Sequence, residues 1–393
     1  MARVLAVIDG EHYAPVVRDA LAGLDHEVVA AFLAGGTEKL RGGEEYGVPV
    51  VRDFDAALAE LGPELVIDLS DEPVLPPTAR LLLASRALAR GAVYEGADFR
   101  FEPPALAPFP LPSLTVIGTG KRVGKTAVTG HVARLLARDR EVVVVAMGRG
   151  GPAEPELMET PPTVDDLVAL SRSGRHAASD YLETAALAGV VTIGCRRCGG
   201  GMAGATVDSN VMAGAALAAD RHPDLVVFDG SGAAMPPIAA DARVLVAHDV
   251  TSGLNPYRVL VSDLVLTMDE GVAEQARELT SAPVLTFDLR LRPLSPLEGR
   301  RTAVFTTGPA PVDQLDADVV HVSRNLARRD ALRAELQGLD ADVFLVEVKA
   351  AAIDVVAEAA LEQGGEVVFA DNDVLADGLD EALLALVPQE ART

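Results

Sequence analysis

A glycine-rich loop between a predicted strand and a predicted helix constrains this chain more than any other feature. The run Gly118–Thr126 reads Gly-Thr-Gly-Lys-Arg-Val-Gly-Lys-Thr, after the apolar run Leu114–Ile117 and before a helical pattern that ends near Ala137. In such a loop, successive backbone N–H groups surround phosphate oxygens, and the following helix presents its positive end. The strand, loop and helix together predict a P-loop NTPase domain with a parallel sheet.

The spacing of the loop departs from the usual pattern Gly-x-x-x-x-Gly-Lys-[Ser/Thr]. Counting back from Gly124 places Thr119 at the first position, so the loop is one residue longer than usual or lacks its first glycine. We expect Lys125 to contact the outer phosphates of ATP and the Thr126 hydroxyl to ligate Mg²⁺. The expected nucleotide-binding residues are Gly118, Thr119, Gly120, Lys121, Arg122, Val123, Gly124, Lys125 and Thr126.

Two further cations lie in this loop, Lys121 and Arg122. Outside the loop, lysine occurs only at Lys39 and Lys349, and arginine carries most of the positive charge. Lysines in a composition that prefers arginine indicate that the local chemistry requires a compact, flexible ammonium group. We expect Lys121, Arg122 and Lys125 to act as catalytic residues that neutralise charge on the transferred phosphoryl group. The alternative for Lys121 and Arg122 is a solvated basic pair.

An acidic residue follows another buried run, Leu225–Phe228. Asp229 ends this predicted strand and opens the turn Gly230-Ser231-Gly232. A carboxylate at the end of a strand near a phosphate loop is what a magnesium site needs as its second protein ligand. The sequence therefore predicts a Mg²⁺ site made by Thr126 and Asp229, with an ordinary turn aspartate as the alternative.

Arginines recur in glycine-rich loops that follow predicted strands, at Glu141–Ala146 and Val190–Ile193. Guanidinium groups bind phosphate bidentately, and glycine lets the backbone approach the same anion. Because the carboxyl ends of parallel strands converge, these separate arginines are expected to face one pocket beside ATP. The expected substrate-binding residues for an anionic small molecule are Arg149, Arg175, His176, Arg196 and Arg197. A structural turn is the alternative for the adjacent arginine pair.

Cys195 and Cys198 flank that pair and are the 2 cysteines of the chain. They supply half of a four-thiolate zinc site, but no second pair exists and no histidine lies close in sequence. Two cysteines are also too few for a disulfide framework, which fits a reducing compartment. With no apolar run long enough for a membrane span and no signal peptide, we expect a cytoplasmic protein.

The formal net charge of −24 argues against a nucleic-acid partner, because such binding depends on a basic surface. The length of 393 residues exceeds what one hydrophobic core serves, so several domains are expected. A proline cluster between Pro103 and Pro112 indicates a linker. We predict an N-terminal Rossmann-like α/β domain at 1–110, the P-loop domain at 111–298 and a small C-terminal α/β lobe at 299–393, which either stands alone or extends the middle sheet.

The amino-terminal region alternates short apolar runs with helical patterns, which indicates parallel strands joined by helices. The predicted strands and helices there are Val4–Ile8, Ala14–Leu21, Glu27–Phe32, Phe54–Leu61 and Glu64–Leu69. The first loop, Asp9-Gly10-Glu11-His12-Tyr13, carries no dinucleotide fingerprint. This domain either contacts substrate or a cation when the domains close, or is structural or part of a subunit interface, and a homodimer is left open.

The loop GTGKRVGKT resembles the long phosphate loop of dethiobiotin synthetase, and the segments VVFDGSGAAMPPI and SGLNPYR are similar to later segments of that family. A second resemblance spans most of the chain. The segments DGEHY, GTGKRVGKTA, AMGRGGP, GCRRCGGGMAG and FDGSGA, in this order, resemble the cyclic 2,3-diphosphoglycerate synthetase family. That resemblance implies an enzyme that uses ATP and Mg²⁺ to join the two phosphates of 2,3-diphosphoglycerate into an intramolecular anhydride, releasing ADP and phosphate.

Two other functions stay open from the sequence alone. One is a different ATP-dependent ligase of the dethiobiotin synthetase type, which acts on a carboxylate or carbamate. The other is a nucleotide-switched regulatory protein, since similar loops drive dimer switches. A switch protein would hydrolyse ATP slowly and respond to a protein partner rather than to diphosphoglycerate.

Overall fold

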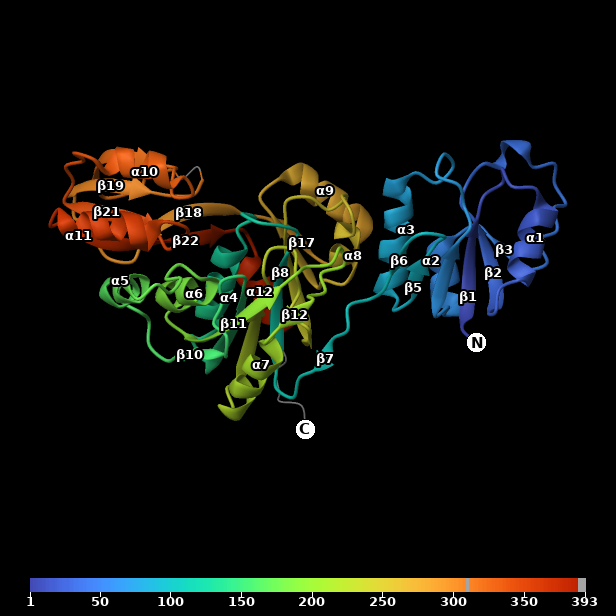
Figure 1. Cartoon of the computed structure of the whole chain (residues 1–393), viewed down its shortest axis with the longest axis horizontal. Coiled ribbons are helices and arrows are strands. Elements are labelled where there is room, and N and C mark those ends of the chain that lie inside the picture. Colours follow the sequence, from blue (N-terminus) through green and yellow to red (C-terminus); the bar gives the residue numbers. More distant parts are fainter. Residues whose placement is uncertain (309–310, 388–393) are drawn as a thin grey trace.

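The computed structural model describes residues 1–308 and 311–387, and these form three α/β units around separate sheets. The units follow one another along the long axis, from the blue amino-terminal unit through the central sheet to the orange and red carboxy-terminal sheet (Figure 1). The predicted class is confirmed: a P-loop domain with a parallel sheet, preceded by a Rossmann-like unit and followed by a small α/β lobe. Residues 309–310 and 388–393 of the predicted C-terminal lobe lie outside the described residues.

The amino-terminal unit holds a six-stranded sheet in the order β3-β2-β1-β4-β5-β6, parallel except for β6. Apolar residues of β1 pack alternately against α1 on one face and against α2 and α3 on the other, which buries the strand and explains its continuous apolar run. The elements are β1 (Arg3–Ile8), α1 (Ala14–Ala22), β2 (Glu27–Leu33), η1 (Thr37–Lys39), β3 (Val50–Val51), α2 (Phe54–Leu61), β4 (Leu65–Asp68), α3 (Pro77–Ala89), β5 (Val93–Glu95) and β6 (Arg100–Phe101).

The strands and helices predicted for this unit are confirmed to within two residues at each end. Local signals account for this accuracy at α2, where the Asp53 side chain accepts a hydrogen bond from the Ala56 N–H and Gly62 ends the helix at φ +54°. The helices η1 and α3 and the short strands β3, β5 and β6 were not predicted.

The central unit is built on a nine-stranded sheet whose path is β10-β11-β9-β13-β8-β15-β16-β17, with β12 paired to β11. Its elements are β7 (Ala107–Pro108), β8 (Ser113–Gly118), α4 (Lys125–Leu136), β9 (Val142–Gly148), β10 (Glu156–Met158), α5 (Val164–Arg172), α6 (Asp180–Ala188), β11 (Val191–Cys198), β12 (Asp208–Ser209), α7 (Val211–Asp220), β13 (Leu225–Asp229), β14 (Ile238–Ala239), β15 (Ala242–Ala247), α8 (Asn255–Leu260), β16 (Leu264–Thr267), α9 (Glu270–Leu279) and β17 (Val284–Thr286).

The strands from β11 to β17 along this path are all parallel, so their carboxyl ends lie at one edge. The strand β13 lies between β8 and β9, although it follows both in sequence. Consecutive strands that do not pair leave a crevice at the carboxyl edge, where α/β sheets bind ligands. The phosphate loop leaves β8 at this edge.

The carboxy-terminal unit has its own five-stranded sheet, in the order β18-β22-β21-β19-β20, and is therefore not an extension of the central one. Its elements are β18 (Asp288–Pro293), β19 (Arg301–Phe305), β20 (Asp318–Ser323), α10 (Arg329–Leu336), β21 (Val343–Glu347), η2 (Ala352–Ala357), α11 (Glu358–Glu362), β22 (Glu366–Leu375) and α12 (Leu379–Leu386).

The carboxy-terminal sheet nevertheless shares a hydrophobic core with the central unit. Val128 of α4 belongs to the same buried cluster as Val346 of β21. Ion pairs join the same elements, since Arg134 of α4 contacts Asp371 of β22 at 2.6 Å. The helix that follows the phosphate loop is thus packed between the two sheets.

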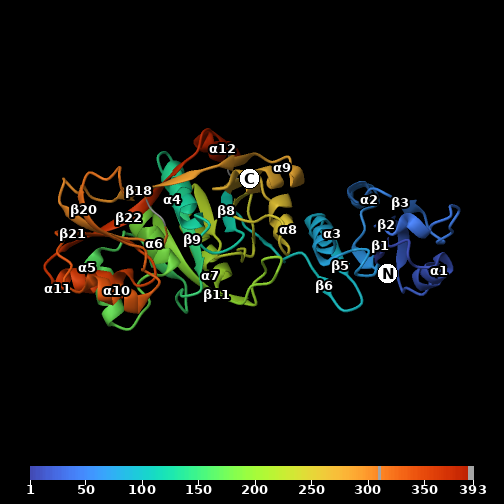
Figure 2. The same ribbon diagram turned by 90° about the horizontal axis from the view of Figure 1, so that it is seen from above.

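The amino-terminal unit meets the central unit through α3, which packs against α8. Figures 1 and 2 both show α3 beside α8, with the rest of the blue unit standing away from the central sheet. The predicted proline-rich linker is an extended segment, and within it Ala107 of β7 pairs with Ile238 of β14. The linker is therefore fastened to the central unit before the chain enters β8.

Candidate functional site

The phosphate loop joins β8 to α4 and contains two residues with left-handed backbone. Gly124, at φ +88°, immediately precedes α4, and Arg122 has φ +61°. A left-handed conformation is uncommon for arginine and is often retained at functional sites. The side chains of Lys121 and Arg122 are exposed, and neither forms an ion pair within the described ranges. They are free to meet a ligand at the mouth of the loop.

Lys125 and Asp229 form a buried ion pair at the base of the loop. The Lys125 ammonium donates to Asp229 Oδ1 at 2.6 Å, and the Thr129 hydroxyl donates to the same oxygen at 2.7 Å. Burial raises the pKa of the Asp229 carboxyl, although Lys125 and Thr129 oppose that change. The other oxygen, Asp229 Oδ2, is buried with no hydrogen-bond partner among the described residues.

That unpartnered oxygen tests whether the site suits a magnesium ion. A buried acceptor without a partner is costly, and a divalent cation or a water bound to one would satisfy it. Thr126 lies in the first turn of α4, next to Lys125. Carboxylate and hydroxyl oxygens are the ligands that Mg²⁺ takes in P-loop proteins, so the residues present fit this ion.

A second carboxylate at this edge, Asp180, was missed by the sequence reasoning. Asp180 begins α6, and its Oδ2 lies 3.1 Å from where a Cβ on Gly148 would be. Its charge also raises the pKa of Asp229, which places the two carboxylates within electrostatic reach. The one sequence signal was an acidic residue at the start of a helix, which is too common to single out a site.

Two of the predicted arginines converge beside the phosphate loop. Arg197 donates to the Gly199 carbonyl and to the Ser231 carbonyl, both at 2.8 Å. A Cβ on Gly232 would lie 2.8 Å from Arg149 Nη2 and 3.8 Å from Arg197 Nη2, so both guanidinium groups flank this glycine. Burial and the nearby Arg149 charge lower the pKa of Arg197. Two cations held together in this way create a strong site for an anion.

The arginine pair is adjacent to the phosphate loop through Gly232. The Gly232 carbonyl lies 3.0 Å from where a Cβ on Gly118 would be, so no larger residue fits at position 118 without movement. Gly232 itself has φ +58°, which favours glycine. The turn after β13 therefore touches the loop on one side and Arg149 and Arg197 on the other.

The remaining predicted substrate-binding residues are placed differently. Arg196 precedes Arg197 on β11, and successive strand residues project to opposite faces, so the two guanidinium groups do not form one clamp. Arg175 pairs with Glu156 of β10, and this contact raises the pKa of Arg175. His176 lies against Gly150, where a Cβ would be 2.7 Å from His176 Cδ2. His176 thus borders the loop that carries Arg149, whereas Arg175 is engaged elsewhere.

A histidine beyond the sequence predictions contacts the phosphate loop from the opposite side. His248 follows β15, and its Nδ1 lies 2.9 Å from the Thr119 hydroxyl oxygen, which also accepts the His248 backbone N–H at 3.1 Å. A Cβ on Gly120 would lie 2.7 Å from His248 Cε1. The lengthened first half of the loop is thus held against β15, and Gly120 allows the histidine ring to approach.

The two cysteines differ in environment. Cys195 is buried beside α7, and burial raises the pKa of its thiol to about 12, whereas Cys198 is exposed. Both are free thiols. Among residues 1–308 and 311–387, no group of three His, Cys, Asp or Glu side chains has metal-binding geometry, so the structure gives the zinc interpretation no support.

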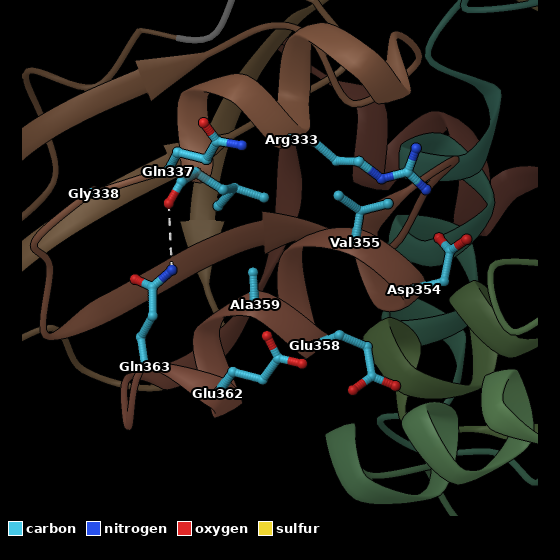
Figure 3. Close-up of a pocket in the computed structure, with 10 residues that line it drawn as sticks. Arg333, Gln337, Gly338, Asp354, Val355, Glu358, Ala359, Glu362 and Gln363 are labelled. Atoms are coloured by element: carbon cyan, nitrogen blue, oxygen red, sulfur yellow. Dashed lines mark hydrogen bonds between the residues drawn. The ribbon is translucent and has the colours of Figure 1, made fainter.

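A hollow of about 360 Å³ lies on the carboxy-terminal unit, between α10, η2 and α11. Figure 3 shows Arg333 across it from the carboxylates of Asp354, Glu358 and Glu362. Acidic side chains outnumber the arginine, which disfavours a polyanion. We therefore assign the chemistry to the carboxyl edge of the central sheet rather than to this hollow.

Three family models match the chain in order. They are described as the N-terminal domain, the P-loop domain and the C-terminal domain of cyclic 2,3-diphosphoglycerate synthetase, over residues 3–102, 113–281 and 293–373. A cyclic 2,3-diphosphoglycerate synthetase of Rubrobacter xylanophilus is 46% identical, with 99% of this chain and 98% of the relative aligned. The chain belongs to the cyclic 2,3-diphosphoglycerate synthetase family.

Archaeal members of the cyclic 2,3-diphosphoglycerate synthetase family are similar over the same extent. The protein of Thermococcus gammatolerans is 43% identical, with 97% of this chain and 96% of the relative aligned, and that of Methanothermus fervidus is 37% identical, with 98% and 96% aligned. The resemblance drawn from the motifs is thus confirmed. No helix in the described part of the chain has the length and apolar character needed to cross a membrane.

Proposed function

We propose that this chain is an ATP-dependent enzyme that converts 2,3-diphosphoglycerate into cyclic 2,3-diphosphoglycerate, with release of ADP and phosphate. The observation that carries the proposal is the convergence of Arg149 and Arg197 on Gly232, which itself touches the phosphate loop. A substrate with two phosphates needs such a cluster of cations next to the nucleotide. The names of the aligned relatives point to the same reaction.

The reaction divides into two displacements. In the first, an oxygen of one substrate phosphate attacks the γ-phosphorus of ATP, the bond to ADP breaks, and a diphosphate group forms on the substrate. In the second, an oxygen of the other substrate phosphate attacks the inner phosphorus of that group, inorganic phosphate leaves, and the ring closes. The second step is intramolecular, so holding both phosphates in place supplies much of the acceleration.

The protein contributes positioning and positive charge in both steps. Lys125 leaves Asp229 to reach the β- and γ-phosphates, and Lys121 and Arg122 neutralise the transferred phosphoryl group. Thr126 and Asp229 would hold Mg²⁺, which would supply further positive charge for phosphoryl transfer, and Asp180 lies within electrostatic reach of Asp229.

The substrate phosphates bind between Arg149 and Arg197 in this proposal. Arg196 and His176 border the same edge and contact the substrate as it enters, whereas Arg175 is held by Glu156 away from it. The amino-terminal domain 1–110 and cytoplasmic residence belong to this proposal, whereas the boundary expected between 111–298 and 299–393 lies before β18 instead, because that strand pairs with β22 of the carboxy-terminal sheet. The amino-terminal unit either contacts substrate or a cation when the domains close, or is structural or part of a homodimer interface.

Phosphorus NMR of the purified chain with ATP, MgCl₂ and 2,3-diphosphoglycerate tests the function directly. We expect new diphosphate resonances from the cyclic product, together with equimolar ADP and inorganic phosphate. ATP consumption without a cyclic product would refute the proposed substrate. A control without 2,3-diphosphoglycerate measures the slow hydrolysis that a nucleotide switch would show.

A further inference from the structure

One arginine of the central unit is fully buried without a carboxylate partner. Arg258 on α8 is 2% exposed, and it forms no ion pair within the described ranges. Burial lowers the pKa of its guanidinium to about 10. Burying a charge is costly unless hydrogen bonds compensate it, so a residue of this kind has a specific structural task.

The Arg258 guanidinium joins three separate segments. Its Nε and Nη2 donate to the Ala233 carbonyl at 3.1 and 2.7 Å. Its Nη1 lies within hydrogen-bond distance of three oxygens, the Met202 carbonyl at 2.9 Å and Leu254 O and Asn255 Oδ1, both at 3.3 Å. Only a planar fork with several donors spans these acceptors, and a lysine ammonium does not.

Two of those segments are the turns that hold Arg197. The first follows β11 and includes Gly199, whose carbonyl accepts from Arg197, and Met202, whose carbonyl accepts from Arg258. The second follows β13 and includes Ser231, whose carbonyl accepts from Arg197, and Ala233, whose carbonyl accepts from Arg258. Arg197 and Arg258 therefore bridge the same pair of turns at two points.

We propose that Arg258 is a positioning residue, which fixes the spacing of the two turns so that Arg197 and Arg149 face the anionic substrate beside the phosphate loop. This inference rests on the proposed function of the site. The helix that carries Arg258 also packs against α3, so the amino-terminal unit supports it from outside. Arg258 acts on the substrate side of the phosphate loop and has no contact with the loop itself among the bonds described above.

The test compares Arg258→Lys with Arg243→Lys as a matched control. Arg243 is another largely buried arginine of the same region, and its Nη1 donates to Val261 O at 2.6 Å, just beyond α8. It lies near the start of β15, at the edge of the sheet opposite the site. Both substitutions keep the positive charge but replace the planar guanidinium, with its several N–H donors, by a single ammonium group.

We expect Arg258→Lys to raise the KM for 2,3-diphosphoglycerate about tenfold or more, a change equal to at least one weakened charged hydrogen bond, while ATP affinity stays unchanged. Arg243→Lys should alter neither constant. An unchanged substrate KM, or an equal loss of ATP and substrate affinity in Arg258→Lys, overturns the inference.

Hydrogen exchange separates failure of this inference from failure of the proposed function. If the wild-type chain makes no cyclic product, the function is wrong, and exchange still decides the positioning role. Faster amide exchange at residues 199–204 and 230–235 in Arg258→Lys, but not in Arg243→Lys, supports that role. Identical exchange in these two turns refutes it.

Discussion

Asp229→Asn tests the electrostatics at the base of the phosphate loop. The Lys125 side chain is 9% exposed and that of Asp229 is 1% exposed, with 2.6 Å between Nζ and Oδ1. Removing one partner of such a pair leaves a buried charge uncompensated, which costs about 3–5 kcal/mol of folding free energy. We therefore expect Asp229→Asn to lower the free energy of unfolding of the nucleotide-free protein by about that amount.

The double variant Lys125→Met, Asp229→Asn gives the sharper result. Burial raises the pKa of Asp229 despite the adjacent ammonium, so desolvation outweighs the attraction between the two charges. Replacing both charges should then give a protein at least as stable as wild type, although one that no longer binds ATP. The Lys125–Asp229 pair therefore serves nucleotide binding and does not stabilise the fold.

Urea denaturation followed by circular dichroism measures these changes. The control is Asp224→Asn, an exposed carboxylate before the same strand, whose Oδ2 accepts the Glu141 N–H at 2.7 Å. It should cost less than about 1.5 kcal/mol, the range of one ordinary hydrogen bond. If the double variant is no more stable than Asp229→Asn, the reasoning is refuted.

Three further predictions concern other side chains of the central unit. Burial raises the pKa of Glu183 from 4.5 to about 7, so the folded state holds its proton more tightly than the unfolded state. The free energy of unfolding should therefore fall as the pH rises from 4.5 to about 7, with a shallower slope in Glu183→Gln. Urea titration at each pH measures it. Arg197→Ala should raise the substrate KM strongly, whereas Arg221→Ala, which removes a peripheral ion pair, should leave it unchanged in the phosphorus NMR assay. Iodoacetamide should modify Cys198 and spare buried Cys195. A double Cys→Ser variant that loses activity together with bound zinc would contradict the conclusion that both cysteines are free thiols.

The parallel strands and the phosphate loop were predictable because their signals are local. A strand such as β9, buried on both faces, is a continuous apolar run, and the loop glycines lie at fixed spacing before a helix. Asp229 was predictable for the same reason, since it ends such a run. Each of these features depends on neighbours in sequence.

The residues that the sequence did not reveal act across long separations. His248 meets Thr119 and Arg258 meets Ala233 only because the sheet brings distant turns together. The expectation that Arg196 and Arg197 work as a pair overlooked the extension of β11 through both residues, which sends them to opposite faces. Arg175 found a carboxylate on β10, a strand whose existence was not predicted.

The core that α4 shares with the carboxy-terminal sheet limits how this chain can be divided. A fragment that ends near residue 298 would keep every loop of the site yet expose the apolar side of the helix that starts at Lys125. The last sheet therefore cannot be removed as a module unless the exposed face of the helix that follows the phosphate loop is redesigned. The nucleotide site and the carboxy-terminal sheet thus depend on one shared core.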